Sequence, residues 1–349
     1  MPTESDMKDG GSEKHDTRTV VNDHSVLSPQ SSVLALAGGV GGAKLAHGLQ
    51  MALPVGALSV AVNTGDDFHL WGLHISPDLD TVMYTLAGLA NRAWGWGIEG
   101  DTWAAMDQLA RYGRDPWFRL GDRDLATHVL RTQLLGEGRT LTEVTADLSS
   151  ALGIQNHLLP MCDEPVKTII QTPEGSLDFQ EYFVRHRHAD TVTGVLLKGI
   201  AYAQPTEQVM SALSTADAII FCPSNPIVST GPILAVPGLL DALKASPAPR
   251  VAVSPIVGGA ALKGPAADML RSLGHEVSPT GVARIYGDAI HGMIIDRLDE
   301  AHAPRIEALG IAVEIADTIM KTDQDRHNLA LTALRFCRTL DDQRAKASM

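Results

Sequence analysis

The most distinctive polar turn of the chain is Gly38-Gly39-Val40-Gly41-Gly42-Ala43-Lys44, which follows the apolar run 33–37. Glycines between a strand and a helix leave backbone N–H groups free to bind a phosphate, and the dipole of the helix adds to the attraction. The spacing matches neither a dinucleotide fingerprint nor a P-loop, because Lys44 stands at the third glycine position and no Ser or Thr follows it. We predict phosphate or nucleotide binding by Gly39, Gly41, Gly42 and Lys44; the alternative is a plain tight turn.

Two turns further along carry pairs of carboxylates. Asp66 and Asp67 end the turn Asn63-Thr64-Gly65-Asp66-Asp67 after the apolar run 58–62. Carboxylates at the end of a strand suit Mg²⁺, which often lies between carboxylates and phosphates. These two residues are therefore the candidate metal ligands, although Asp and Asn are also ordinary turn residues.

Asp78 and Asp80 in Ser76-Pro77-Asp78-Leu79-Asp80-Thr81 stand at the start of an expected helix. Either can cap that helix. Either can also bind a metal or take a proton from a hydroxyl group. The sequence favours neither reading.

Two further motifs are candidates for ligand contact. Arg119 begins the segment Arg119-Leu120-Gly121-Asp122-Arg123-Asp124, whose charges either form weak surface ion pairs or supply a guanidinium to an anion. The rigid loop Pro223-Ser224-Asn225-Pro226 follows another apolar run, and the Asn225 amide is suited to read the edge of a base or a ribose. A simple turn is the alternative for this second motif.

All five tryptophans lie within one stretch of the chain: Trp71, Trp94, Trp96, Trp103 and Trp117. They either pack a helical core or form an aromatic wall for a flat heterocycle. The histidines of Arg185-His186-Arg187-His188 are interleaved with bases, which favours a solvated face over a metal site. The sequence shows no Ser/His/Asp or Cys/His triad signature and no HExxH motif.

The elements that position these residues follow from short apolar runs at 33–37, 58–62, 218–221, 251–253 and 293–295. Each run ends in a polar or glycine-containing turn, as buried parallel strands do. We predict an α/β fold with a Rossmann-like, mostly parallel sheet. Helical patterns at 81–89, 102–112, 125–135 and 141–152 indicate a helical insertion at about 80–160. A polar tail covers 1–31, one domain covers 32–340, and 341–349 is expected to fray.

Composition narrows the possible partners. The 349 residues include 28 Lys and Arg against 41 Asp and Glu, a net charge of -13, which argues against nucleic acid and anionic membranes as partners. The three cysteines, Cys162, Cys222 and Cys337, are far apart, so we expect neither a disulfide framework nor a zinc ribbon. We find no membrane-spanning stretch and no signal peptide, and a reducing cytoplasm fits best.

Taken in order, the motifs resemble the 2-phospho-L-lactate transferase family of coenzyme F420 biosynthesis. The resemblance runs from about 33 to 320 and rests on AGGVGGAKL, VNTGDDF, ISPDLDT, the Trp-Gly-Ile-Glu stretch at 96–99, RLGDRDLATH, LPMCDEPV, PSNPIVSTGPI and VAVSPIVGG. It implies a Rossmann-like sheet with a helical insertion and, by family likeness, a homodimer.

The resemblance also implies a reaction. A phosphorylated three-carbon acid (2-phospholactate, phosphoenolpyruvate or 3-phosphoglycerate) passes from a guanosine diphosphate-linked donor to the ribityl hydroxyl of the deazaflavin Fo. GMP leaves, and Mg²⁺ is required. Asp80 and Arg119 match Fo-contacting positions, with Asp78 and Trp71 as further candidates. The glycine turn, Ser224 and Asn225 would face the nucleotide.

A mechanism follows as a hypothesis. Asp80 orients or deprotonates the hydroxyl, Asp66 or Asp67 holds Mg²⁺, and Lys44, Arg119 or Arg123 stabilises the growing charge. The alternative is a related family that shares the glycine turn and binds UDP-sugars or other nucleotides as a regulator of cell-wall metabolism. The complete SPDLD and GDRD motifs and the tryptophans favour the transferase.

Overall fold

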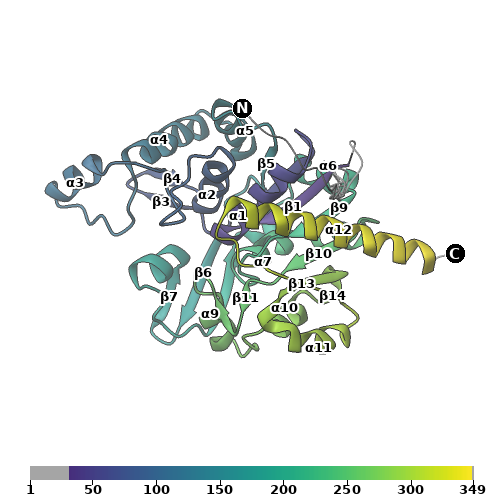
Figure 1. Ribbon diagram of the computed structural model, residues 1–349. Helices are drawn as coiled ribbons and strands as arrows, with labels where there is room; N and C mark the ends of the chain where they lie inside the picture. Colours follow the sequence, from purple (N-terminus) through teal and green to yellow (C-terminus); the bar gives the residue numbers. More distant parts are fainter. Residues whose placement is uncertain (1–30, 348–349) are drawn as a thin grey trace, which may run out of the picture.

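A seven-stranded parallel sheet forms the centre of the protein, for which the computed structural model describes residues 31–347 (Figure 1). The strand order is β14-β13-β10-β9-β1-β2-β5, and every neighbouring pair is parallel. The strands are β1 (Val33–Ala37), β2 (Leu58–Val62), β5 (His157–Pro160), β9 (Ala218–Phe221), β10 (Arg250–Val253), β13 (Gly292–Asp296) and β14 (Ala312–Ala316). The prediction of a Rossmann-like α/β fold is confirmed.

The strands are continuous apolar runs because helices cover both faces of the sheet. Alternate residues of β1 point to opposite faces, so Val33, Ala35 and Ala37 join one core and Leu34 and Leu36 the other. The first core includes α1 (Gly39–Ala52), α2 (Pro77–Leu86), α5 (Leu141–Ala151) and α12 (Asp323–Ala347). The second includes α6 (Glu207–Thr215), α7 (Thr230–Ala235), α8 (Leu239–Ala245), α9 (Ala266–Ser272), α10 (Pro279–Tyr286) and α11 (Ala303–Glu307).

The predicted helical segment contains all four expected helices: α2, α3 (Ala104–Arg111), α4 (Asp122–Gly136) and α5. Helices α2 and α5 pack on the central sheet. A small lobe that includes α3 and the hairpin β3 (Phe68–Leu70) and β4 (Leu73–Ile75) has an apolar cluster of its own. Figure 1 shows α3 and α4 extending away from the sheet.

A second sheet follows β5, with the antiparallel order β7-β6-β8. Its strands are β6 (Lys167–Thr172), β7 (Gly175–Asp178) and β8 (Gly194–Lys198), and the π-helical turn Glu181–Arg185 follows β7. The remaining short elements are the hairpin β11 (Ile256–Val257) and β12 (Ala260–Ala261) and the 3₁₀ turns Ile200–Tyr202, Gly287–Ala289 and Arg297–His302.

The two ends of the chain compare differently with expectation. The predicted tail lies outside the described residues up to position 30. At the other end, where we expect fraying from residue 341, helix α12 extends to Ala347. Within residues 31–347, no helix is long and apolar enough to cross a membrane. Cys162, Cys222 and Cys337 are all free and buried.

Candidate active site

The candidate site lies where the sheet order reverses. The chain leaves β1 toward β2 on one side, whereas β9 leads to β10 on the other. Open α/β sheets bind ligands beyond the carboxyl ends of the strands at such a switch point. The glycine turn after β1 and the loop after β9 both stand there, so the fold brings together two motifs that are 186 residues apart.

The glycine turn packs directly against the Pro223–Pro226 loop. The Gly38 N–H donates to Ser224 Oγ at 3.1 Å, and the Ser224 hydroxyl donates back to the Gly38 carbonyl at 2.9 Å. A Cβ atom on Gly41 would collide with the Pro223 carbonyl, and one on Gly42 would lie 2.6 Å from Ser224 Oγ. Close packing of α1 against this loop therefore accounts for the glycines at 41 and 42.

Two carboxylates converge at the turn. The Gly39 N–H donates to Asp78 Oδ1 at 2.6 Å. The Asn63 amide bridges the two acids, donating to Asp78 Oδ2 at 2.9 Å and to Asp66 Oδ1 at 3.1 Å. Gln180 Nε2 donates to the other oxygen of Asp66 at 2.9 Å. The end of β2 and the start of α2 thus present Asp66 and Asp78 to one point beside the glycine turn.

Burial raises the pKa of both acids, and repulsion from neighbouring carboxylates adds to the effect. Burial raises the pKa of Asp78 to about 6, against the hydrogen bonds from Asn63 and Gly39. Burial and the nearby charge of Asp78 raise the pKa of Asp66 well above its ordinary value. Two neighbouring carboxylates out of water are stabilised by a proton or by a cation. This arrangement of two buried carboxylates favours the binding of a cation.

Asp67, the other predicted metal ligand, makes different contacts. Its Oδ2 accepts hydrogen bonds from Ser76 Oγ at 2.7 Å and interacts with His74 Nε2 at 3.0 Å. Its Oδ1 is buried without a hydrogen-bond partner among the described residues. The structure therefore pairs Asp66 with Asp78 and places Asp67 against the residues that precede α2. Within residues 31–347, no group of three or more His, Cys, Asp or Glu side chains is arranged to hold a metal.

Asp80 is held in a buried ion pair. Both terminal nitrogens of Arg131, on α4, donate to its two oxygens, and Arg131 is 1% exposed. His128 Nδ1 lies 3.7 Å from Asp80 Oδ2. Side chains two residues apart on a helix point in directions that differ by about 200°. Asp78 therefore faces the glycine turn, while Asp80 faces α4. Sequence reasoning missed Arg131, which has no motif around it.

Arg119 and the tryptophans form a surface cluster. The Arg119 guanidinium lies 4.3 Å from the centre of the Trp103 ring, at an exposed position. Trp94, Trp96 and Trp103 contact one another with ring centres 5.5 to 6.2 Å apart. Trp71, Trp103 and Trp117 all pack against the apolar cluster around the β3–β4 hairpin. The core-packing interpretation therefore applies to these three, and the aromatic wall stays a prediction.

Asp124 of the GDRD motif is buried, and its Oδ1 accepts a hydrogen bond from the Tyr84 hydroxyl of α2 at 2.7 Å, whereas Asp122 and Arg123 bind the tryptophan loop. Asp122 accepts hydrogen bonds from the backbone N–H groups of Ala104 and Ala105, at the start of α3. Arg123 Nη2 donates to the Glu99 carbonyl. These contacts tie the tryptophan loop to α4, which is a structural role that places Arg119 over Trp103.

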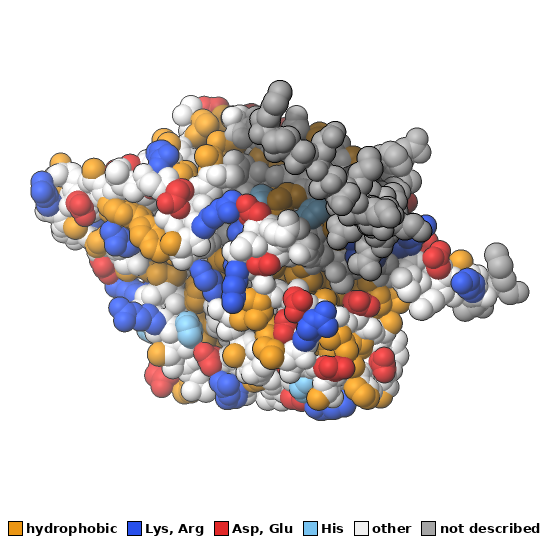
Figure 2. All heavy atoms as spheres, viewed as in Figure 1, with side chains coloured by type: hydrophobic (Ala, Val, Ile, Leu, Met, Phe, Trp, Pro, Cys, Tyr) orange, Lys and Arg blue, Asp and Glu red, His pale blue; other side chains and the backbone are white. Residues whose placement is uncertain are grey.

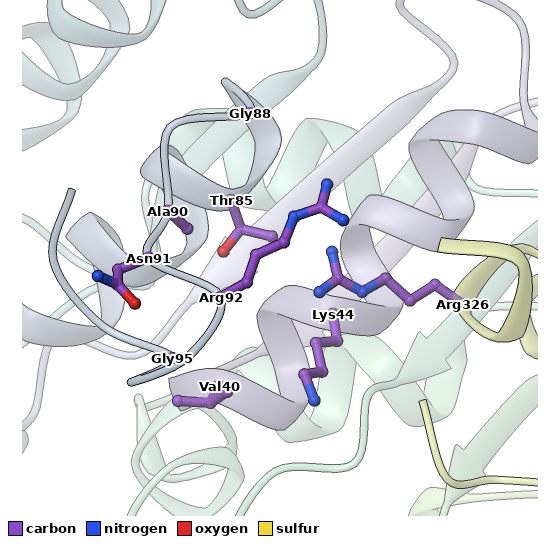
Figure 3. A pocket seen from close by; sticks show the side chains of 9 residues that line it. All are labelled: Val40, Lys44, Thr85, Gly88, Ala90, Asn91, Arg92, Gly95 and Arg326. Atoms are coloured by element: carbon purple, nitrogen blue, oxygen red, sulfur yellow. The ribbon is translucent and has the colours of Figure 1, made fainter. Parts of the chain in front are cut away.

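The remaining nucleotide-site candidates are split between two places. Asn225 Oδ1 accepts hydrogen bonds from the backbone N–H groups of Ile227 and Val228, so part of its amide is used within its own loop. Lys44 points to the side of α1, where its Nζ donates to the Met320 carbonyl at 2.9 Å. There it lines a pocket of about 400 Å³, including the open mouth, together with Arg92 and Arg326 (Figure 3). Neither arginine was predicted, since they are distant in sequence and carry no motif.

Comparison with known proteins identifies the relatives of this chain. Residues 33–329 match the family model described as 2-phospho-L-lactate transferase CofD. A phosphoenolpyruvate transferase of Kitasatospora aureofaciens is 43% identical over 309 residues, covering 86% of this chain and 96% of that protein. A 2-phospho-L-lactate transferase of Methanosarcina mazei is 40% identical over 298 residues, covering 85% and 98%.

The fold has relatives among solved structures. A crystal structure of a UPF0052 family member from Bacillus halodurans superposes with a TM-score of 0.59 and 13% identity, covering 87% of this chain and 99% of that one. This likeness concerns the fold alone. The sequence match over 33–329 and the two relatives carry the assignment: the chain belongs to the 2-phospho-L-lactate transferase CofD family.

Proposed function

We propose that this protein is a transferase of coenzyme F420 biosynthesis. It moves a phosphorylated three-carbon acid from a guanosine diphosphate-linked donor to the ribityl hydroxyl of Fo and releases GMP. Family membership and relatives named phosphoenolpyruvate transferase and 2-phospho-L-lactate transferase support the reaction class. The observation that carries the proposal is the convergence of Asp66 and Asp78 on the glycine turn at the switch point of the sheet.

The donor set of this site fits Mg²⁺. Mg²⁺ is usually held by one or two carboxylates, with substrate phosphates and waters completing its shell. Asp66 and Asp78 supply two carboxylates at one point, and burial raises the pKa of both, so a cation bound there would favour their ionised forms. We therefore assign these two residues as the metal-holding pair, with Asn63 fixing their geometry. Bound there, Mg²⁺ would offset the negative charge of a diphosphate.

Phosphoryl transfer asks little covalent chemistry of a protein, so positioning and charge stabilisation dominate. Asp80 has both oxygens engaged by Arg131, and we assign it the positioning of α2, and with it of Asp78, rather than the removal of a proton. Arg119 and the rings of Trp94, Trp96 and Trp103 offer a planar, cationic surface for the deazaflavin. We propose that Fo contacts this cluster.

A direct assay tests the proposal. The purified chain is incubated with Fo, Mg²⁺ and each of the three guanylylated donors, and GMP and a more anionic fluorescent product are followed by chromatography. We expect both products with at least one donor, and neither when EDTA replaces Mg²⁺. Absence of both products with all three donors, together with tight binding of a UDP-sugar, would replace the transferase by a nucleotide-binding regulator.

A further inference from the structure

Cationic side chains from separate segments converge on the pocket beside α1. Lys44 comes from α1, Arg92 from the loop after α2, and Arg326 from α12 (Figure 3). Lys263 stands at the rim: its Nζ donates to the Trp94 carbonyl at 2.9 Å and lies 2.8 Å from the position of a Cβ on the pocket residue Gly95. In Figure 2, blue side chains gather in the middle of this face, where α1 and the start of α12 lie in Figure 1.

The positive charge of this pocket exceeds the negative charge that faces it. Asp323 pairs with Arg92 at 2.9 Å and with Arg326 at 3.4 Å, and it is the shared counter-ion of both. Among the described residues that line the pocket there is no Asp or Glu. The excess is local, since the whole chain carries a net charge of -13.

Arg326 gives an independent sign of a missing partner. Its side chain is 7% exposed, yet its Nε has no hydrogen-bond partner among residues 31–347. Its Nη1 contacts His47 Nδ1 at 3.3 Å, which supplies no negative charge. A buried donor without an acceptor is unfavourable, and more so when it is charged. One carboxylate, Asp323, thus serves two arginines, and no Asp or Glu among the described pocket-lining residues faces Lys44.

Lys44 reports the same imbalance. Burial and the charges of Arg326 and Lys263 lower its pKa, so the cations of the pocket repel one another. The wall also includes Thr85, whose hydroxyl donates to the Thr81 carbonyl, and Asn91, whose Oδ1 accepts from two backbone N–H groups. Small residues at 88, 90 and 95 leave room between them. Arginine forks and a lysine ammonium are the groups that proteins use for phosphate and carboxylate.

We propose that the pocket of Lys44, Arg92 and Arg326 binds a phosphate-bearing dianion. Lys44 follows Gly39, whose N–H contacts Asp78, by five residues, about 8 Å along α1. Within the transferase reaction proposed above, on which this step rests, its ligand is a phosphate-bearing part of the donor, either the phospho-acid or the guanosine phosphate.

Calorimetric titration of the full chain tests the pocket with three separate probes: inorganic phosphate, phosphoenolpyruvate and GMP. We expect at least one probe to bind and its affinity to fall at least tenfold in Lys44→Met and in Arg92→Met. Arg335→Met, at an exposed position on α12, is the matched control and should bind as the unchanged chain does. Tighter binding of phosphoenolpyruvate assigns the pocket to the acid end of the donor, and tighter binding of GMP to the nucleotide end.

The outcomes separate this inference from the proposed function. The proposal that this pocket binds an anion is wrong if no probe binds, or if every probe binds equally to the unchanged chain and to Lys44→Met. It is also wrong if the Lys44→Met and Arg92→Met enzymes keep the original KM for the donor, even though the transferase would stand. Binding that depends on Lys44, in a chain that forms no product, would overturn the transferase and keep the pocket. Melting curves of each variant exclude loss of folding as the cause.

Discussion

At the scale of single residues, the structure divides four aspartates that look alike in sequence. Asp66 and Asp78 share the Asn63 amide, whereas Asp67 contacts Ser76 and Asp80 binds Arg131. The side chains of adjacent or alternate residues point in different directions. Asp66 is therefore separated from Asp67, whereas Asp66 and Asp78, twelve residues apart, share one partner. This division predicts which carboxylates a metal needs.

Asp66→Asn and Asp78→Asn should each weaken Mg²⁺ binding by at least tenfold, because each removes one of two carboxylates that face the same point. Asp67→Asn is the matched control, and we expect a change of less than threefold. Titration with Mn²⁺ followed by electron paramagnetic resonance measures the affinity without catalysis. Equal losses in all three variants would show that Asp67 also binds the metal.

Titration of Lys44 should make the affinity of the pocket for phosphate depend on pH in a defined direction. Its pKa lies below the ordinary 10.5, because burial and the charges of Arg326 and Lys263 disfavour the ammonium. An anion needs that ammonium, so phosphate affinity should fall as the pH rises through this lowered pKa. Of the other groups that face Lys44, the arginines stay charged, Asp323 stays ionised, and His47, whose pKa is also lowered, stays neutral. Lys263 is the second lysine that acts on Lys44.

Titration of the chain with phosphate between pH 8.5 and pH 10.5 measures this effect, since the ligand itself is then almost entirely the dianion. Lys44→Arg keeps its charge over the whole range and should show a flat profile. A decline of the same steepness in both proteins would assign the pH dependence to another group.

At the scale of elements, the ion pair between α2 and α4 fixes the start of α2. Breaking a buried pair by removal of one partner leaves an uncompensated charge and costs about 3–5 kcal/mol. We expect Arg131→Met to destabilise the protein by about that amount, and Asp80→Asn to recover part of the loss when the two are combined. Chemical denaturation of both single variants and the double variant measures the coupling.

The exposed pair of Arg139 and Asp147 is the control for this cycle. Both partners are accessible to water, so Arg139→Met should leave the unfolding midpoint nearly unchanged. A coupling between Asp80 and Arg131 no larger than that of this surface pair would show that α2 is positioned by its apolar contacts instead.

The elements themselves were largely predictable from the sequence, because each central strand is a local apolar run and each helix of the 77–151 segment has a local periodicity. Neither the β3–β4 hairpin nor the antiparallel pairing of β6, β7 and β8 was predicted. Pairings between elements have no local signal: Asp80 and Arg131 are 51 residues apart, and Lys44 and Met320 are 276 apart. The glycines of the turn suggested phosphate, yet two of them are explained by the close approach of Pro223 and Ser224.

At the scale of the whole molecule, the candidate site draws on parts of the chain that are distant in sequence. The central sheet contributes the glycine turn, the lobe of α3 and the β3–β4 hairpin lies beside the tryptophan cluster, and α12 closes the basic pocket with Arg326. The tryptophan loop connects these parts, since Trp94 contacts both Trp103 and the Lys263 ammonium. We therefore expect substitutions in the tryptophan cluster and in the basic pocket to affect the binding of different substrates.

We expect Arg119→Met to raise the KM for Fo by about tenfold and to leave the KM for the donor within twofold, since the lost charge and stacking lie over Trp103. Lys44→Met should raise the KM for the donor and leave the KM for Fo within twofold, because we propose that its pocket binds the donor. Arg114→Met, an exposed substitution in the same loop as Arg119, should change neither constant. Initial rates with one substrate varied at a fixed excess of the other provide both values. If Arg119→Met and Lys44→Met raise the same KM, the two surfaces bind a single substrate, and the assignment of Fo to the tryptophan cluster is wrong.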